Sequence, residues 1–183
     1  MPSIKGTFGI SLLVGALAVI GWAAAVGTRA GSRTVAARAL AGDVWVAEQL
    51  ETDQLAALKV QGFRTIVDLR PDGEAPDQPP AREMSSAAEK NGLHFTYLPV
   101  PHGDIPLPAV DTLERTLATS ERPVLLYCRS GRRAARTWAL AEASRKDGLG
   151  AAAIEAAVAS AGQSADDLAA QIAARVAARA ATP

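Results

Sequence analysis

Apolar residues in the middle of the chain come in short runs, separated from one another by turn residues and helix-type patterns. Runs of this kind, rich in β-branched and aromatic residues, predict strands. The predicted strands are residues 43–46, at an edge of the sheet, and residues 63–69, 94–100 and 124–127. Residues 124–127 are apolar or aromatic throughout, which is typical of a strand buried on both faces of a parallel sheet.

Helices are predicted between these strands. The first has Leu55 and Leu58 on one face and ends at Gly62. The others cover residues 81–91 and 108–120. Strands that alternate with helices at this spacing predict an α/β fold, in which helices flank a mostly parallel central sheet.

Three polar side chains lie at or beyond the carboxyl ends of predicted strands, namely Asp68, Asp104 and Cys128. Ligands of parallel sheets bind in the crevice outside these strand ends. We therefore expect the three side chains to lie together in one such crevice.

A different pattern occupies the amino terminus, where residues 8–28 carry no charge. This length is enough to span a bilayer, so we predict an N-terminal transmembrane anchor within residues 1–30 and a single-pass membrane protein. A cleaved signal peptide is the alternative, because Lys5 precedes the run and small residues at 23–25 suit cleavage. The arginines after the run favour a cytoplasmic over a periplasmic soluble domain.

The rest of the chain divides into a linker or short helix at 31–42, a central α/β domain at 43–147 and an alanine-rich tail at 148–183. In the tail, Leu168, Ile172 and Val176 recur every four residues and predict one or two helices that cover the sheet or a partner. Ser164 and Asp167 have the spacing of a capping box.

Composition narrows the functional classes. Nineteen basic and nineteen acidic residues cancel among 183, so net charge does not favour nucleic-acid binding. A single cysteine excludes an intramolecular disulfide and a cysteine-rich zinc site. The histidines and acids have no ligand spacing, and there is no glycine-rich nucleotide loop. We therefore expect neither a metal nor a cofactor.

The chemistry is concentrated where the last predicted strand ends, at Cys128. Ser130 and Gly131 permit a tight turn, after which helix-forming residues begin. This geometry points backbone N–H groups and the positive end of a helix at one spot, where they would stabilise a thiolate and bind an oxyanion. The predicted anion-binding residues are Arg129, Ser130, Gly131, Arg132 and Arg133. The sequence thus indicates a nucleophile and an anion site together.

Three segments in order resemble the phosphatase-like domain of the beta-lactamase-hydrolase-like family, a bacterial group with a protein-tyrosine-phosphatase-like fold. The segments are residues 48–50 (EQL), 62–74 (GFRTIVDLRPDGE) and 126–133 (LYCRSGRR). The resemblance covers residues from about 43 to 143 and implies a cysteine-dependent phosphatase-like hydrolase of a small anionic substrate. It implies Cys128 as nucleophile and Arg133 as the arginine that holds the anion. Asp104 has the place of the general acid in dual-specificity phosphatases, and His102 is a second candidate.

The active-site loop departs from the tyrosine-phosphatase pattern. Those enzymes have five residues between the cysteine and the arginine, whereas four separate Cys128 from Arg133 here. The shorter spacing resembles that of rhodanese sulfurtransferases, whose cysteine carries a persulfide. Sulfur transfer is therefore the alternative activity. A non-catalytic module that binds an anion or a partner at the membrane is a third hypothesis, and no protein partner is indicated.

Overall fold

The computed structural model describes residues 34–180, and the predicted membrane anchor at 8–28 lies outside them. Among the residues described, no helix combines the length and the apolar character needed to cross a membrane. The prediction of an anchor therefore remains a prediction.

A five-stranded sheet forms the centre of the domain, with the strand order β1-β2-β5-β3-β4. Its strands are β1 (Arg38–Ala39), β2 (Val44–Ala47), β3 (Thr65–Asp68), β4 (His94–Tyr97) and β5 (Val124–Tyr127). Strand β1 pairs antiparallel with β2, and all the other pairings are parallel. Strand β5 lies between β2 and β3 and is buried along its whole length, which agrees with its continuous apolar sequence.

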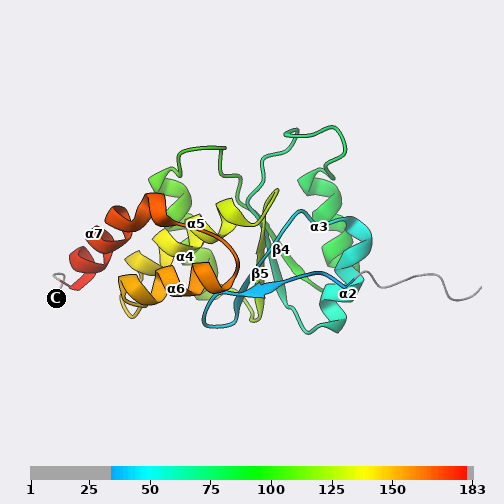
Figure 1. The fold of residues 1–183 in the computed structure, drawn as a ribbon. Helices are drawn as coiled ribbons and strands as arrows, with labels where there is room; N and C mark the ends of the chain where they lie inside the picture. Colours follow the sequence, from blue (N-terminus) through cyan, green and yellow to red (C-terminus); the bar gives the residue numbers. More distant parts are fainter. Residues whose placement is uncertain (1–33, 181–183) are drawn as a thin grey trace, which may run out of the picture. The chain divides into compact units, whose positions relative to one another are not determined.

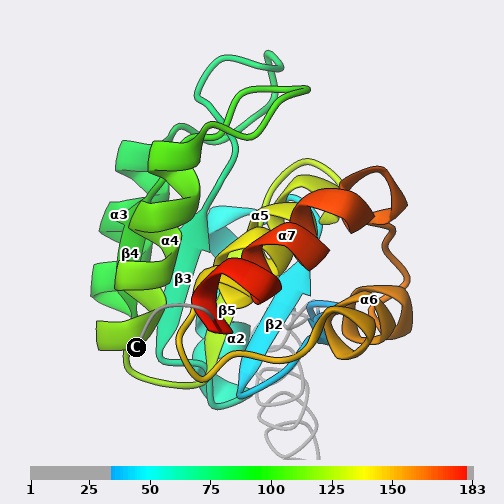
Figure 2. The same cartoon turned by 90° about the vertical axis from the view of Figure 1, so that its left-hand side faces the viewer.

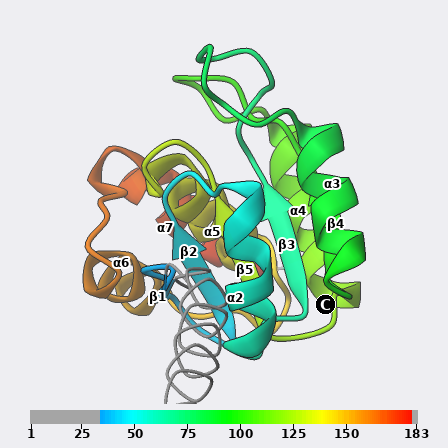
Figure 3. The same cartoon turned by 90° about the vertical axis from the view of Figure 1, so that its right-hand side faces the viewer.

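Helices cover both faces of the sheet (Figure 1). They are α2 (Leu55–Val60), α3 (Ala81–Lys90), α4 (Leu107–Thr119), α5 (Arg132–Ser144), α6 (Ala151–Ser160) and α7 (Ala169–Ala180), with short 3-10 turns η1 (Thr52–Gln54) and η2 (Asp166–Leu168). Figure 3 shows the face that carries α2 and α3, and Figure 2 shows the opposite face. The predicted α/β fold with a mostly parallel sheet is therefore confirmed.

Alternation along the strands divides the apolar residues between two cores. Ile66, Leu125 and Tyr127 pack against residues of α2 and α3. Val67 and Leu126 pack with residues of α4 and α5 on the other face. The helices α2 and α3 therefore bury their apolar residues against one face of the sheet, and α4 and α5 against the other.

The alanine-rich tail forms the helices α6 and α7, and α7 lies over α5 (Figure 2). Small side chains allow the two helices to approach closely. The guanidinium of Arg179 donates to the backbone carbonyls of Glu142 (2.9 Å), Gly148 (2.8 Å) and Leu149 (2.6 Å). These bonds satisfy carbonyl groups where α5 ends, so the tail continues the packing of the domain.

Local details differ from the sequence prediction in three places. The predicted edge strand β2 is internal, because β1, within the segment predicted as a linker or short helix, pairs with it. A strand of two residues has no periodicity that a sequence can display. The predicted capping box does not form, because Asp167 faces arginines of α5 and the N–H of Asp166 bonds to Ser164 Oγ at 3.3 Å.

The helix α2 offers a matched test of the core. Leu58 is 0% exposed and Val60 is 88% exposed. We expect Leu58→Ala to lower the free energy of unfolding by about 2–5 kcal/mol, because it leaves a cavity between α2 and the sheet. Val60→Ala should change it by no more than about 0.5 kcal/mol. Urea denaturation followed by circular dichroism measures both, and equal losses would contradict this assignment of faces.

Candidate active site

The lone cysteine lies where β5 ends, at the centre of the sheet. Cys128 is 1% exposed and follows directly on the buried strand. Beside it is a cleft of about 360 Å³, lined by His102, Gly103, Cys128, Arg129, Ser130, Arg132, Arg133 and Arg136. The cleft therefore combines one thiol with several arginines at the carboxyl ends of parallel strands, as expected for this fold.

The loop from Cys128 to α5 needs a glycine at one position. Gly131 has φ +82°, in the left-handed region. A Cβ atom there would lie 2.9 Å from Gln163 Nε2 and 3.3 Å from the carbonyl oxygen of Ala47. Both the backbone conformation and the surrounding space thus require a residue without a side chain.

The carbonyl groups of this loop are engaged, while its N–H groups are free. The backbone N–H of Gln49 donates to the carbonyl of Arg129 at 3.3 Å, and the side-chain amide of Gln163 donates to that of Ser130 at 3.1 Å. Within residues 34–180, the backbone N–H groups of residues 129–133 donate no hydrogen bond to the protein. They form the N–H cradle that the sequence predicts, at the start of α5.

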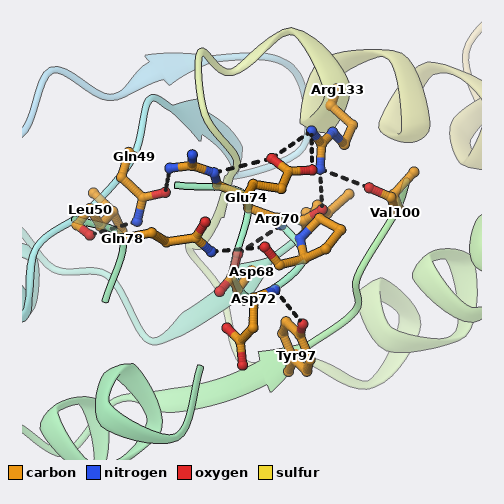
Figure 4. A network of polar contacts seen from close by, with 12 residues as sticks. Gln49, Leu50, Asp68, Arg70, Asp72, Glu74, Gln78, Tyr97, Val100 and Arg133 are labelled. Atoms are coloured by element: carbon orange, nitrogen blue, oxygen red, sulfur yellow. Dashed lines mark hydrogen bonds and ion pairs between the residues drawn. The ribbon is translucent and has the colours of Figure 1, made fainter. Parts of the chain in front are cut away.

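Arg133 reaches the cleft, and protein groups fix its guanidinium (Figure 4). Its Nη1 donates to the carbonyls of Leu69 (3.3 Å) and Val100 (2.7 Å), beyond the ends of β3 and β4. Its Nη2 lies 2.9 Å from Glu74 Oε1 and 3.0 Å from Glu74 Oε2. The Nε–H takes part in none of these contacts, so one donor of the fixed guanidinium remains for a ligand.

Glu74 also holds a second buried arginine (Figure 4). Arg70 places Nε 3.2 Å from Glu74 Oε2 and donates from Nη1 to Gln49 Oε1 at 2.8 Å. Since the backbone of Gln49 holds the loop carbonyl of Arg129, one polar network connects β2, β3 and the active-site loop. Sequence reasoning missed Glu74 and Gln49, although both lie in the segments that carry the family resemblance.

The two acids predicted beside the cysteine have different positions. Asp104 is exposed and does not line the cleft, but its neighbour Gly103 does, as does His102. Asp68 is 1% exposed and accepts the backbone N–H of Arg70 at 2.8 Å. It therefore lies beneath the turn and not in the cleft, so the expectation that Asp68 shares a crevice with Cys128 is wrong.

Burial dominates the titration of Asp68. Desolvation raises its pKa from 3.8 to about 6, against the opposing effect of the hydrogen bond from Arg70 N–H. Burial and the adjacent Asp68 carboxyl also raise the pKa of Tyr127. The Tyr127 hydroxyl is buried, and no group in the described chain meets the geometry of a hydrogen bond with it.

A further arginine of the cleft was not identified from the sequence. Arg136 donates from Nη1 to the carbonyl of Gly103 at 3.3 Å and forms an ion pair with Asp167 through Nη2. Its Nε is buried and has no partner among the described residues. The spacing along the sequence could have identified Arg136. It lies four residues after Arg132, which lines the cleft, and residues four apart lie on one face of a helix.

The residues described contain no group of three or more His, Cys, Asp or Glu side chains placed to hold a metal ion. The cleft itself offers a thiol, several guanidinium groups and backbone N–H dipoles.

Solved structures with the same fold belong to phosphatases. A candidate phosphatase from Neisseria meningitidis is 26% identical, with a TM-score of 0.66 over 75% of this chain and 96% of that one. Tk-PTP in its active form has a TM-score of 0.54 at 19% identity, over 78% of this chain and 97% of that one. The fold is thus that of the protein-tyrosine-phosphatase-like phosphatases.

The sequence itself identifies the family. A family model of the beta-lactamase hydrolase-like protein, phosphatase-like domain, matches residues 36–145. The chain belongs to this family, which confirms the resemblance found in the sequence. A beta-lactamase hydrolase-like protein from Xylella fastidiosa is 37% identical over 97 residues, which are 53% of this chain and 22% of that protein. The matched segment thus covers only about a fifth of that relative's length.

The buried carboxyl of Asp68 gives a pH prediction. Because its pKa in the folded protein is about 6, above the ordinary 3.8, the folded state binds a proton more tightly than the unfolded state. Compared with Asp68→Asn, the wild type should lose stability as pH rises from about 4 to about 7, by up to about 3 kcal/mol in total. Denaturation of both proteins across this range measures the difference. A difference that is constant or changes in the opposite direction would contradict the assignment.

Proposed function

We propose that the chain is a cysteine-dependent hydrolase of phosphate monoesters. The observation that carries the proposal is the position of Cys128 at the end of β5, below unoccupied backbone donors of residues 129–133 and beside a cleft rich in arginine. Backbone N–H groups and guanidinium groups bind the oxygens of a phosphoryl group, and they stabilise charge that develops on those oxygens. The phosphatase fold and family support the same class of reaction.

The proposed reaction has two steps. The Cys128 thiolate attacks phosphorus, an S–P bond forms, and the P–O bond to the leaving group breaks while that oxygen takes a proton from a general acid. Water then attacks phosphorus and loses a proton to the same group. The S–P bond breaks, inorganic phosphate leaves and the thiolate is restored.

The arginines have different roles in binding the anion. Arg133, held by Glu74 and two carbonyls, offers its Nε–H from a fixed orientation. Arg129 and Arg132 are exposed, so they supply charge that can follow substrates of different shapes. A guanidinium that is already oriented loses little conformational freedom on binding, and this favours Arg133 as the ligand of the reacting phosphoryl group.

Asp104 is the proposed general acid. It directly follows Gly103, which lines the same cleft as Cys128. His102 lines the cleft itself and is the competing candidate. Protonation of the leaving oxygen requires one of them to approach the substrate to hydrogen-bond distance.

Sulfur transfer is the second candidate, and the four-residue spacing between Cys128 and Arg133 favours it. In that reaction the thiolate attacks the outer sulfur of thiosulfate, an S–S bond forms and sulfite leaves. Cyanide then takes the outer sulfur of the persulfide as thiocyanate, and the thiolate returns. No general acid is needed, which agrees with the exposure of Asp104.

A paired assay separates these activities. We expect the wild type to hydrolyse p-nitrophenyl phosphate and Cys128→Ser to lose this turnover, because a hydroxyl is a far weaker nucleophile than a thiolate at neutral pH. Both proteins are also given thiosulfate and cyanide, and the single cysteine is checked for a persulfide by mass spectrometry. Sulfur transfer without phosphatase activity would replace the first proposal with the second. Activity that survives in Cys128→Ser would overturn both.

The general acid is tested by changing the leaving group. Phenolate leaves poorly unless protonated, whereas p-nitrophenolate leaves readily. Asp104→Asn should therefore lower kcat for phenyl phosphate by about 10²–10³-fold, and that for p-nitrophenyl phosphate much less. His102→Asn is the matched control and should affect both substrates alike. If His102→Asn alone shows the dependence on leaving group, His102 is the acid and the assignment of Asp104 is wrong.

A further inference from the structure

The tail beyond the family match contributes side chains to the active-site loop. The match ends at residue 145, and two residues that follow it contact the residues around Cys128. Gln163 donates to the carbonyl of Ser130, and Asp167 pairs with two arginines of the cleft. Both side chains come from the part of the chain that lies outside the family match.

We propose that Asp167 is a specificity-determining residue that sets how much negative charge the cleft accepts. The inference rests on the proposed anion site at Cys128, whichever atom that cysteine attacks. By offsetting the charge of Arg132 and Arg136, the Asp167 carboxylate weakens the binding of doubly charged oxyanions more than that of singly charged ones.

The geometry makes Asp167 a direct competitor of a bound anion. Its two oxygens go to different arginines, Oδ1 lying 3.5 Å from Arg132 Nη2 and Oδ2 pairing with Arg136 Nη2. Both arginines line the same cleft as Cys128. An oxyanion that uses either guanidinium must share it with this carboxylate.

The two pairs differ in strength because they differ in exposure. The side chain of Arg136 is only 14% exposed, whereas that of Arg132 is 56% exposed. Water screens the outer pair strongly and the inner pair much less. The effect of Asp167 therefore acts mainly through Arg136, because water screens that ion pair less.

The neighbouring residue provides a matched control. Asp166 belongs to the same 3-10 turn η2 and is also exposed. Within residues 34–180 its side chain forms no ion pair and no hydrogen bond. Asp166→Asn and Asp167→Asn thus remove the same charge from adjacent positions, and only the second removes a contact with the cleft.

Tungstate and perrhenate are suitable probes, because both are tetrahedral oxyanions of similar size that carry two charges and one. Calorimetry measures their affinity for the wild type and both variants without any turnover. Since Coulomb energy is proportional to the charge of the anion, we expect Asp167→Asn to bind perrhenate about threefold and tungstate about tenfold more tightly than the wild type. Asp166→Asn should change either affinity by less than about twofold.

Several results would overturn the proposal. Equal effects of the two variants would show a long-range charge effect without a role for the contact. Weaker binding in Asp167→Asn, with an unchanged melting temperature, would show that Asp167 holds Arg136 for binding instead of competing with the anion. Failure of the wild type and Asp167→Asn to bind either probe would refute the anion site together with this inference. A protein that binds tungstate but hydrolyses no ester would refute only the proposed hydrolysis.

Discussion

A single carboxylate, that of Glu74, makes it possible for two arginines to be buried side by side. Arg70 and Arg133 have side chains only 6% and 9% exposed, and each lies within 3.2 Å of a Glu74 oxygen. Two guanidinium groups at this depth would repel one another, and a shared carboxylate between them offsets that cost. Because Arg133 lies in the first turn of α5 and Gln49 ties Arg70 to the loop, the shape of the active-site loop depends on this pair of contacts.

Asp167 repeats this arrangement on the outer side of the cleft, where it lies between Arg132 and Arg136. The side chain of the inner carboxylate, Glu74, is 22% exposed, so water screens its ion pairs less than it screens those of Asp167. The outer one is 46% exposed, so it offsets charge without removing it. A site that binds anions must stay positive, yet a cluster of arginines destabilises the folded chain. Carboxylates that engage some N–H groups of each arginine and leave others free satisfy both demands.

The fold was predictable where a regular pattern extends over a whole element. The continuous apolar run of β5 and the apolar face of α2 identified the layers, and the turn at Ser130 and Gly131 after Cys128 located the cradle. The sequence could not reveal β1, which is two residues long, nor the depth of Asp68 below the turn. It also concealed the roles of Glu74 and Asp167, because their partners lie 59 and 31 residues away. Contacts of that kind depend on packing that only the folded chain defines.

The arrangement of donors bears on the class of substrate that reaches Cys128. The short loop puts Arg133 on the first turn of α5, where the carbonyls of Leu69 and Val100, beyond the ends of β3 and β4, hold its Nη1. Charge on the open side of the cleft therefore comes from Arg129, Arg132 and Arg136. The persulfide itself has no oxygens, but the thiosulfate that would deliver its sulfur carries three oxygens and two negative charges. A phosphoryl group brings oxygens that point both into the cradle and outward. Arginines in excess of the cradle thus favour an oxyanion substrate with several oxygens, a class to which both phosphate esters and thiosulfate belong.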